Sequence, residues 1–158
     1  MRLIDISTPK FPNTFAMVDD EDFDFLNQWK WHPHKDHKWI YATRKKHKEN
    51  FQIHRFILNA SLNMLVDHLD GNGLNNQKEN LRVCTKQQNC FNKKKMERAN
   101  GSIYKGVYKI RNKFISQIGF NYKTIVIGKF DTEIQAALAY NEAAKIYHGD
   151  FARLNKIS

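Results

Sequence analysis

The sequence predicts an α+β fold in two parts: a strand–loop–strand–helix (ββα) unit with a β-rich N-terminal extension, then a three-stranded antiparallel sheet packed on one helix. Three observations lead to this prediction. Short apolar runs flank a polar, turn-rich segment at 70–77 and precede a capped helix. Three strand-like runs in the last third are separated by two-residue turns. A second capped helix with an apolar stripe follows them.

The first 60 residues form the predicted β-rich extension. All three Trp residues lie here, and the runs 39–43 and 51–57 are rich in β-branched and aromatic residues, which predicts the two strands of a hairpin. The connecting run, 44–50, carries four Lys or Arg residues. This basic tip has two interpretations, a solvated loop or a loop that faces nucleic acid.

Residues 61–99 predict the ββα unit. The runs 64–66 and 81–84 are apolar, and the segment between them is rich in Asp, Gly and Asn. Thr85 with Gln88 three residues later fits a capping box, so a helix is expected to begin at Thr85. We expect that helix to continue through the lysines at 93–95 to Arg98.

After a joint at 100–102, the runs 104–110, 113–120 and 123–130 predict three strands. The turns between them, at 111–112 and 121–122, each contain an Asn, which tolerates a left-handed backbone.

The last predicted helix covers 133–147. Thr132 and Gln135 form a capping box at its start, and Gly149 lies where a C-terminal cap belongs. We expect small residues to let this helix lie close to the sheet. The expected inner stripe is Ile134, Ala137, Leu138 and Ala144, with Tyr140 and Tyr147 at its margins.

Composition points to a polyanionic partner. The 158 residues include 26 Lys or Arg and 16 Asp or Glu, a net charge of +10. Nucleic acid is the first candidate; a membrane surface is disfavoured because no amphipathic helix concentrates the basic residues. No run is long enough for a membrane span, and the N-terminus lacks a signal-peptide pattern. Cys84 and Cys90 are expected to be buried thiols rather than zinc ligands. We expect a soluble, intracellular protein.

The chemistry-bearing residues cluster in the ββα unit. Asp67 and His68 end a short strand, where neighbouring side chains point to opposite sides, and Asn89 lies early in the following helix. Oxygen ligands suit Mg²⁺, and a neutral His near a water can take the water's proton during phosphodiester hydrolysis. The alternative is a surface Asp–His pair beside a turn.

The segments 66–76, 79–82 and 88–89 closely resemble the HNH endonuclease motif, in the subgroup with Asn in place of the last His, as in many phage and intron homing nucleases. The resemblance implies a ββα-metal nuclease unit over residues 1–99, with the motif at 64–95. His68 matches the general base, and Asp67 and Asn89 match the metal ligands. Asn80 matches the residue that holds the loop and positions the base. Mg²⁺ or Mn²⁺ is the implied metal.

The segment 54–57 is similar to what precedes the motif in phage members. His54 therefore either contacts a phosphate or packs within its strand. Arg55 and the lysines that follow the motif are further expected DNA contacts: Lys93, Lys94 and Lys95.

Residues 101–155 resemble the plant APETALA and ethylene-response-factor DNA-binding domain, so a second domain is expected at 100–158. That family lays its sheet in the DNA major groove. The alternative is a scaffold that only packs on the nuclease, although residues 101–158 carry nine basic and four acidic residues. The positions in the implied groove-facing region have few Arg residues, which favours phosphate contacts over base reading. The DNA contacts implied by the resemblance are Lys105, Tyr108, Lys109, Arg111, Lys113, Gln117 and Thr124.

The sequence thus predicts a metal-dependent, homing-type endonuclease acting on double-stranded DNA. One site makes one cut, so a monomer would nick one strand and a homodimer could cut both. The rival is a non-catalytic, sequence-specific DNA-binding regulator with a decayed nuclease unit; an RNA-directed nuclease is a third possibility. If the chain is phage-encoded, we expect it in the cytoplasm of a bacterial host.

Overall fold

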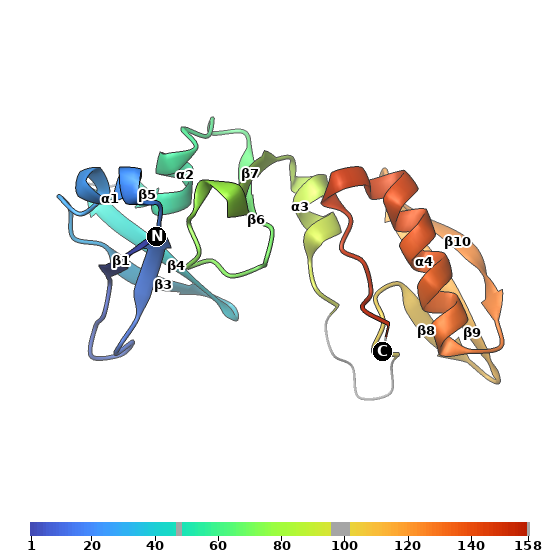
Figure 1. Ribbon diagram of the computed structural model, residues 1–158. Coiled ribbons are helices and arrows are strands. Elements are labelled where there is room, and N and C mark those ends of the chain that lie inside the picture. Colours follow the sequence, from blue (N-terminus) through green and yellow to red (C-terminus); the bar gives the residue numbers. More distant parts are fainter. Residues whose placement is uncertain (47–48, 96–101, 158) are drawn as a thin grey trace. The chain divides into compact units, whose positions relative to one another are not determined.

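The computed structural model describes residues 1–46, 49–95 and 102–157 (Figure 1). The chain divides into two compact units, Met1–Lys86 and Gln87–Ser158. Both combine helices with small antiparallel sheets, which confirms the predicted mixture of α and β structure. Within the described residues, no helix has the length and apolar character needed to cross a membrane.

The first unit holds three small antiparallel sheets. They pair β1 with β2, β3 with β4 and β5, and β6 with β7. The predicted strands on either side of the turn-rich segment are confirmed as β6 and β7. The elements are β1 (Arg2–Asp5), β2 (Phe15–Val18), α1 (Asp20–Leu26), β3 (His32–Asp36), β4 (Trp39–Lys46), β5 (Glu49–Gln52), α2 (Ile53–Ile57), β6 (Leu65–His68), the 3₁₀ turn η1 (Lys78–Asn80) and β7 (Leu81–Cys84).

The core of this unit gathers side chains from the whole N-terminal extension. Trp31 is almost fully buried, and its indole Nε1 donates to the Leu26 carbonyl at 2.9 Å. A buried Trp thereby satisfies its only polar group and fixes the end of α1 against the sheets. The buried apolar cluster is Ile4, Ile6, Ala16, Val18, Leu26, Trp31, Ala42 and Ile53.

The predicted hairpin is only partly correct. β4 pairs antiparallel with β5, but the chain turns into helix α2 at Ile53, so the expectation of a strand through 57 was wrong. In this helix the Arg55 guanidinium donates to the carbonyls of Ala60, Ser61 and Met64 and so holds the segment that follows α2. The residues at 47–48, in the predicted basic tip, lie outside the described residues.

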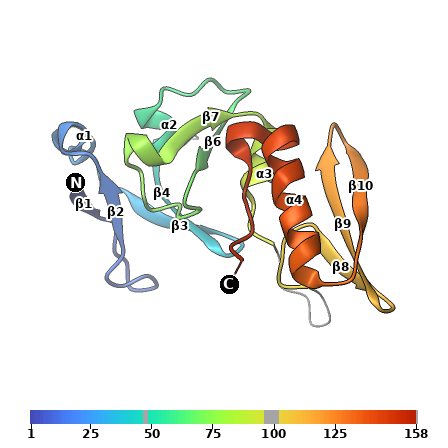
Figure 2. The same ribbon diagram turned by 45° about the vertical axis from the view of Figure 1, so that its right-hand side comes forward.

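The second unit packs helix α4 on one face of a three-stranded sheet of order β10-β9-β8, as predicted (Figures 1 and 2). The first strand begins at Val107 rather than at 104. Gly106 precedes it with φ +75°, and a Cβ at that position would collide with the Tyr140 ring. The elements are α3 (Lys86–Asn92), β8 (Val107–Ile110), β9 (Lys113–Phe120), β10 (Lys123–Phe130), α4 (Glu133–His148) and the 3₁₀ turn η2 (Gly149–Phe151).

The two hairpin turns use left-handed residues in different ways. Asn121 and Tyr122 both have positive φ, which is the pattern of a type I′ turn. In the first turn it is Arg111, not the neighbouring Asn, that takes φ 53°. The expected role of Asn is therefore confirmed in one turn only.

Helix α4 has the predicted ends. Thr132 and Gln135 form the complete capping box, and Gly149 has φ 53°. The predicted inner stripe was partly wrong, because Ile134 and Leu138 are nearly half exposed. The rotation of α4 about its own axis, rather than the size of its apolar side chains, determines which residues face the sheet. The buried positions are Ala136, Ala137, Tyr140, Asn141, Ala143, Ala144 and His148.

Helix α3 belongs to the second unit by its contacts. The Phe91 ring stacks on the His148 imidazole with centroids 3.7 Å apart and planes 11° apart. The helix begins directly after Thr85, as predicted, but ends at Asn92, so the predicted continuation through 93–95 was wrong; 96–98 lie outside the described residues. Cys84 is buried as expected, whereas Cys90 on α3 is exposed.

Candidate active site

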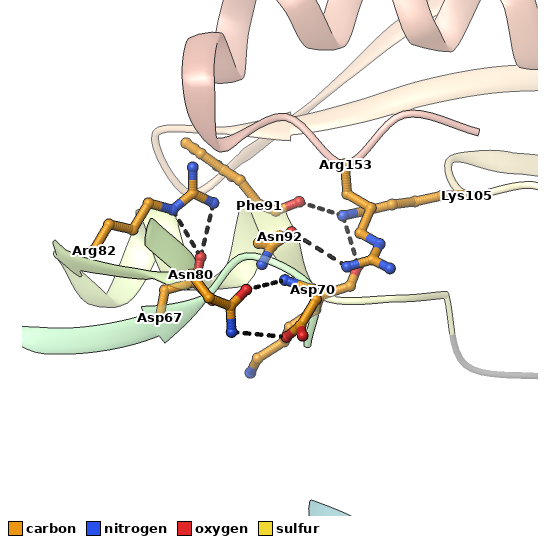
Figure 3. A network of polar contacts seen from close by, with 9 residues as sticks. Asp67, Asp70, Asn80, Arg82, Phe91, Asn92, Lys105 and Arg153 are labelled. Atoms are coloured by element: carbon orange, nitrogen blue, oxygen red, sulfur yellow. Dashed lines mark hydrogen bonds and ion pairs between the residues drawn. The ribbon is translucent and has the colours of Figure 1, made fainter. Parts of the chain in front are cut away.

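Asp67 and His68 are the last two residues of β6, and both are buried. The register of β6 and β7 places Asp67 opposite Arg82. Asp67 Oδ2 accepts hydrogen bonds from Arg82 Nε at 3.0 Å and Nη2 at 2.7 Å (Figure 3). A carboxylate buried in this way needs a cationic partner, and Arg82 supplies it.

His68 lies among aromatic and amide groups. Its Nε2 is 3.4 Å from Asn76 Oδ1, and the Asn76 amide is oriented by donating from Nδ2 to the Leu74 carbonyl at 3.0 Å. The His54 ring meets the His68 ring edge to face, with centroids 5.0 Å apart. Burial lowers the pKa of His68 below 6.5, although Asn76 and the nearby carboxylates act in the opposite direction. The imidazole is therefore neutral near pH 7, as a general base requires.

Asn80 ties together the loop between β6 and β7. Its Oδ1 accepts from the Asp70 backbone N at 3.0 Å, and its Nδ2 donates to Asp70 Oδ1 at 3.1 Å (Figure 3). The same Nδ2 donates to the Asn75 carbonyl at 2.8 Å. The Asn80 carbonyl also accepts from the Leu69 backbone N. Both polar atoms of the Asn80 side chain therefore contact the loop beside His68.

The Asp70 carboxylate is the centre of the same loop. It accepts from the Asn72 backbone N at 2.7 Å and from the side chains of Asn75 and Asn80. Burial alone would raise the pKa of Asp70, but these hydrogen bonds outweigh it and hold that pKa below its usual value. The loop is thus organised around a carboxylate that stays ionised.

The N-terminal extension supports this loop from outside. Met17 on β2 donates to the Leu74 carbonyl and accepts from the Asn76 backbone N, both at 2.8 Å. Gly73 lies against β4 so closely that a Cβ there would be 2.5 Å from the Ile40 carbonyl oxygen and 2.7 Å from the Tyr41 ring. The position of Asn76, and hence of the His68 contact, depends on the extension.

The other predicted site residues of the first unit, His54 and Arg55, contact other parts of the same unit. His54 is buried on α2, and burial, followed by the neighbouring His68 and Arg55, lowers its pKa to about 3. Its Nδ1 is buried without a hydrogen-bond partner among the described residues. The guanidinium of Arg55 is engaged by three backbone carbonyls.

Asn89 lies on α3 in the second unit and is half-buried. Its role as a metal ligand stays a prediction. No group of three or more His, Cys, Asp or Glu side chains in the described ranges could by itself hold a metal ion. A metal bound through Asp67 would need further ligands of another kind, such as amide oxygens and water.

The predicted DNA-contact residues of the second unit do not share one surface of the sheet. Lys93, Lys94 and Lys95 follow α3, and Arg111 lies in the first hairpin turn. Lys105 precedes the sheet, and its amine donates to the carbonyls of Phe91 and Lys93 (Figure 3). Lys109 pairs with Phe114, so strand alternation places it on the face that carries α4. The residues on the opposite face are Tyr108, Lys113, Gln117 and Thr124.

Comparisons with known proteins find similarity in the segment that forms this site. The HNH endonuclease family profile matches residues 62–90, which span β6, the loop, β7 and most of α3. An uncharacterized HNH endonuclease of Acanthamoeba polyphaga mimivirus is 36% identical over 151 residues, covering 91% of this chain and 76% of the relative. The chain belongs to the HNH endonuclease family.

A second relative is an SPbeta prophage-derived protein of Bacillus subtilis whose name assigns it to the HNH homing endonucleases. It is 34% identical over 74 residues, or 44% of this chain and 43% of the relative. No solved structure gives a significant match. HNH endonucleases are hydrolases that act on DNA, and they generally depend on a divalent metal.

Sequence reasoning missed two partners of the site in this HNH endonuclease. Arg82 pairs with Asp67, and Asn76 contacts His68. Pairing β6 with β7 in antiparallel register would have indicated Arg82, because residues directly opposite each other share a face. No sequence signal separates Asn76 from the other Asn residues of its loop.

Proposed function

We propose that this HNH endonuclease is a metal-dependent, homing-type enzyme that hydrolyses one phosphodiester bond of duplex DNA, with the sheet of the second unit as a DNA anchor. The observation that carries the proposal is the buried, neutral His68 beside Asp67 at the end of β6, in a loop held by Asn80. The homing assignment draws on the name of the prophage relative and on the motif.

The donor chemistry fits Mg²⁺ or Mn²⁺. Asp67 offers a carboxylate, and Asn89 offers a neutral amide oxygen; such hard oxygen donors, with waters, suit these ions better than Zn²⁺. Arg82 already donates two hydrogen bonds to Asp67 Oδ2, so a metal held by Asp67 would lie beside this guanidinium. When bound, the metal stabilises negative charge that develops on the scissile phosphate.

The residues of the chain supply the proton transfer. His68 is neutral and accepts the proton of the attacking water; Asn76 and the edge-to-face His54 ring orient its imidazole. Asn80 and Asp70 keep the loop in the conformation that holds Asn76 in place. The second unit contributes Asn89 and the outer face of its sheet, which carries Tyr108, Lys113, Gln117 and Thr124.

The test is cleavage of supercoiled plasmid and of genomic DNA from the source, with Mg²⁺ or with EDTA, and with the cut ends mapped. We expect metal-dependent nicked product if one site acts alone, and linear product if a dimer acts. His37→Ala is a suitable control variant because His37 is exposed. Binding without any cleavage at any Mg²⁺ or Mn²⁺ concentration would instead support the non-catalytic regulator.

A further inference from the structure

The second unit contains a cavity of about 420 Å³ that is separate from the residues of the sheet's outer face. It lies between the residues that follow α3, the segment before β8 and the C-terminal tail. Five basic side chains line it, and the described lining residues include no carboxylate. The basic lining residues are Lys94, Lys95, Lys105, Arg153 and Lys156.

The wall of this cavity is fixed by reciprocal amide contacts. Asn155 Oδ1 accepts from the Lys105 backbone N at 2.6 Å, and Asn155 Nδ2 donates to the Lys105 carbonyl at 3.0 Å. Asn141 on α4 holds the backbone of Asn155 in the same way, at 2.7 and 2.9 Å. The C-terminal tail is thus tied both to helix α4 and to the segment before β8, so the cavity is built before any ligand binds.

Three of the five basic side chains hold the walls, and one of them is Arg153, whose Nη1 donates to Asn92 Oδ1 at 3.5 Å (Figure 3). The Lys105 amine donates to carbonyls at the end of α3, and the Lys95 amine donates to the Ser102 carbonyl and, at 3.2 Å, to that of Val107. Burial, reinforced by the charge of Arg153, lowers the pKa of Lys105 to about 8. Five basic side chains line this one cavity, which favours an anion as ligand because a bound anion would reduce the repulsion among them.

Lys94 and Lys156 are exposed, whereas the amines of Lys95 and Lys105 donate to carbonyls of the cavity wall. They lie on two different segments of the lining, one after α3 and one in the tail. A concave site lined by one sign of charge focuses the field toward an anion. The described lining residues carry no carboxylate, which favours an anion over a metal cation as ligand.

We propose that this cavity binds one backbone phosphate of nucleic acid, at a place distinct from the outer face of the sheet. The inference deepens the proposed function, on which it rests, by adding a second kind of DNA contact. Phosphate oxygens are the ligand that several Lys and Arg side chains recognise together. Free inorganic phosphate has the same chemistry and is the alternative source.

The first experiment follows backbone amides by two-dimensional NMR on the full chain, which has a mass of 18.7 kDa. The protein is titrated in EDTA with a duplex oligonucleotide and, separately, with inorganic phosphate. We expect the duplex to shift the signals of Lys105 and of 153–156 at lower concentration than phosphate does. Shifts with phosphate but not with duplex would overturn the nucleic-acid assignment, and no shift with either ligand would overturn the site.

The second experiment measures duplex affinity in EDTA at several salt concentrations for Lys94→Gln/Lys156→Gln. The control, Lys10→Gln/Lys145→Gln, removes the same charge at two exposed lysines outside the cavity. Losing one phosphate contact lowers the slope of log K against log salt by about 0.9. The cavity variant therefore loses roughly threefold more affinity at 50 mM than at 200 mM salt, relative to wild type. Equal slopes in the cavity variant and the control would contradict the proposal.

Neither experiment depends on cleavage. If the wild-type chain binds duplex as described but never cuts DNA, the proposed nuclease function fails and the phosphate site stands. If the chain cuts DNA but the cavity variant behaves like the control, the phosphate site fails alone.

Discussion

His68 is a residue whose environment determines its protonation state. Because we propose that His68 takes the water's proton, removing it is expected to reduce the cleavage rate by roughly 10²–10⁴-fold, the usual contribution of a general base. DNA affinity is expected to stay within about twofold of wild type. The measurement is single-turnover cleavage by His68→Ala, with affinity determined separately in EDTA. The control variant is His37→Ala, and near wild-type cleavage by His68→Ala would assign the base to another residue.

We propose that Asn80 acts through the loop residues it contacts rather than on the substrate. Asn80→Ala leaves the Asp70 backbone N and the Asn75 carbonyl without this partner, and each hydrogen bond lost at these partly exposed groups costs about 0.5–1.5 kcal/mol. We expect urea unfolding of the first unit at lower concentration together with slower cleavage at unchanged DNA affinity. Tryptophan fluorescence is the readout, because all three Trp lie in the first unit. Unchanged stability with lost activity would point to direct substrate contact instead.

The predicted metal ligand Asp67 can be tested through the Mg²⁺ concentration that cleavage requires. Asp67→Asn removes the charge while keeping the shape, so the Mg²⁺ concentration for half-maximal cleavage is expected to rise by about tenfold or more, the scale of a lost contact of about 1.5–3 kcal/mol. Asn89→Ala is expected to raise it less and to recover partly at high Mg²⁺. Undiminished cleavage by the wild type in excess EDTA would exclude the metal-dependent mechanism.

At the scale of elements, His148 on α4 packs against Phe91 on α3, in surroundings that disfavour its protonated form. His148 is buried against Phe91, its Nε2 lies 2.9 Å from the Gly119 carbonyl, and its Nδ1 has no hydrogen-bond partner among the described residues. Burial lowers the pKa of His148 despite that carbonyl, and Lys105 lowers it further. A proton on Nδ1 would be buried without an acceptor.

The sign of the pH effect follows. The unfolded chain binds this proton more readily than the folded chain, so the stability of the second unit falls as the pH drops below about 6.5. We expect the melting temperature, followed by circular dichroism of the long helix α4, to decrease from pH 7.5 to pH 5.5. His148→Phe keeps the stacking on Phe91 and is expected to weaken this decrease. An identical pH profile in both proteins would assign the effect to other groups.

At the scale of the whole molecule, the motif and the compact units do not end at the same place. The domain boundary predicted near 100 stays a prediction, but α3, which carries Asn89, has its described packing partners in the second unit. We therefore expect the nuclease activity to depend on residues beyond the family match at 62–90.

A chain truncated after Asn100 tests this dependence. It keeps Asp67, His68, Asn80 and Asn89 but loses the His148 ring that covers Phe91 and the Lys105 amine that caps α3. We expect a lower affinity for duplex DNA, a flatter salt dependence, and cleavage that high enzyme and DNA concentrations restore only partly. If high concentrations restore the full rate, α3 functions without the second unit.

The sequence by itself determined the features that depend on local chemistry. The Asp67–His68 pair, the turn-rich loop with Asn80, the strands β6 and β7, and the capped helix α4 were all predicted, because caps, turns and alternating strands depend on residues close in the chain. The same holds for the nuclease assignment, since a motif with fixed spacing is local information.

Only the tertiary structure showed which side chains contact one another in the site. Arg82 on Asp67, Asn76 on His68 and Lys105 at the end of α3 join residues whose proximity depends on how distant segments pack. Packing also turned Ile53–Ile57 into a helix, exposed Ile134 and Leu138, and ended α3 at Asn92. The physical reason is that burial of a whole face outweighs the small propensity differences on which local prediction rests.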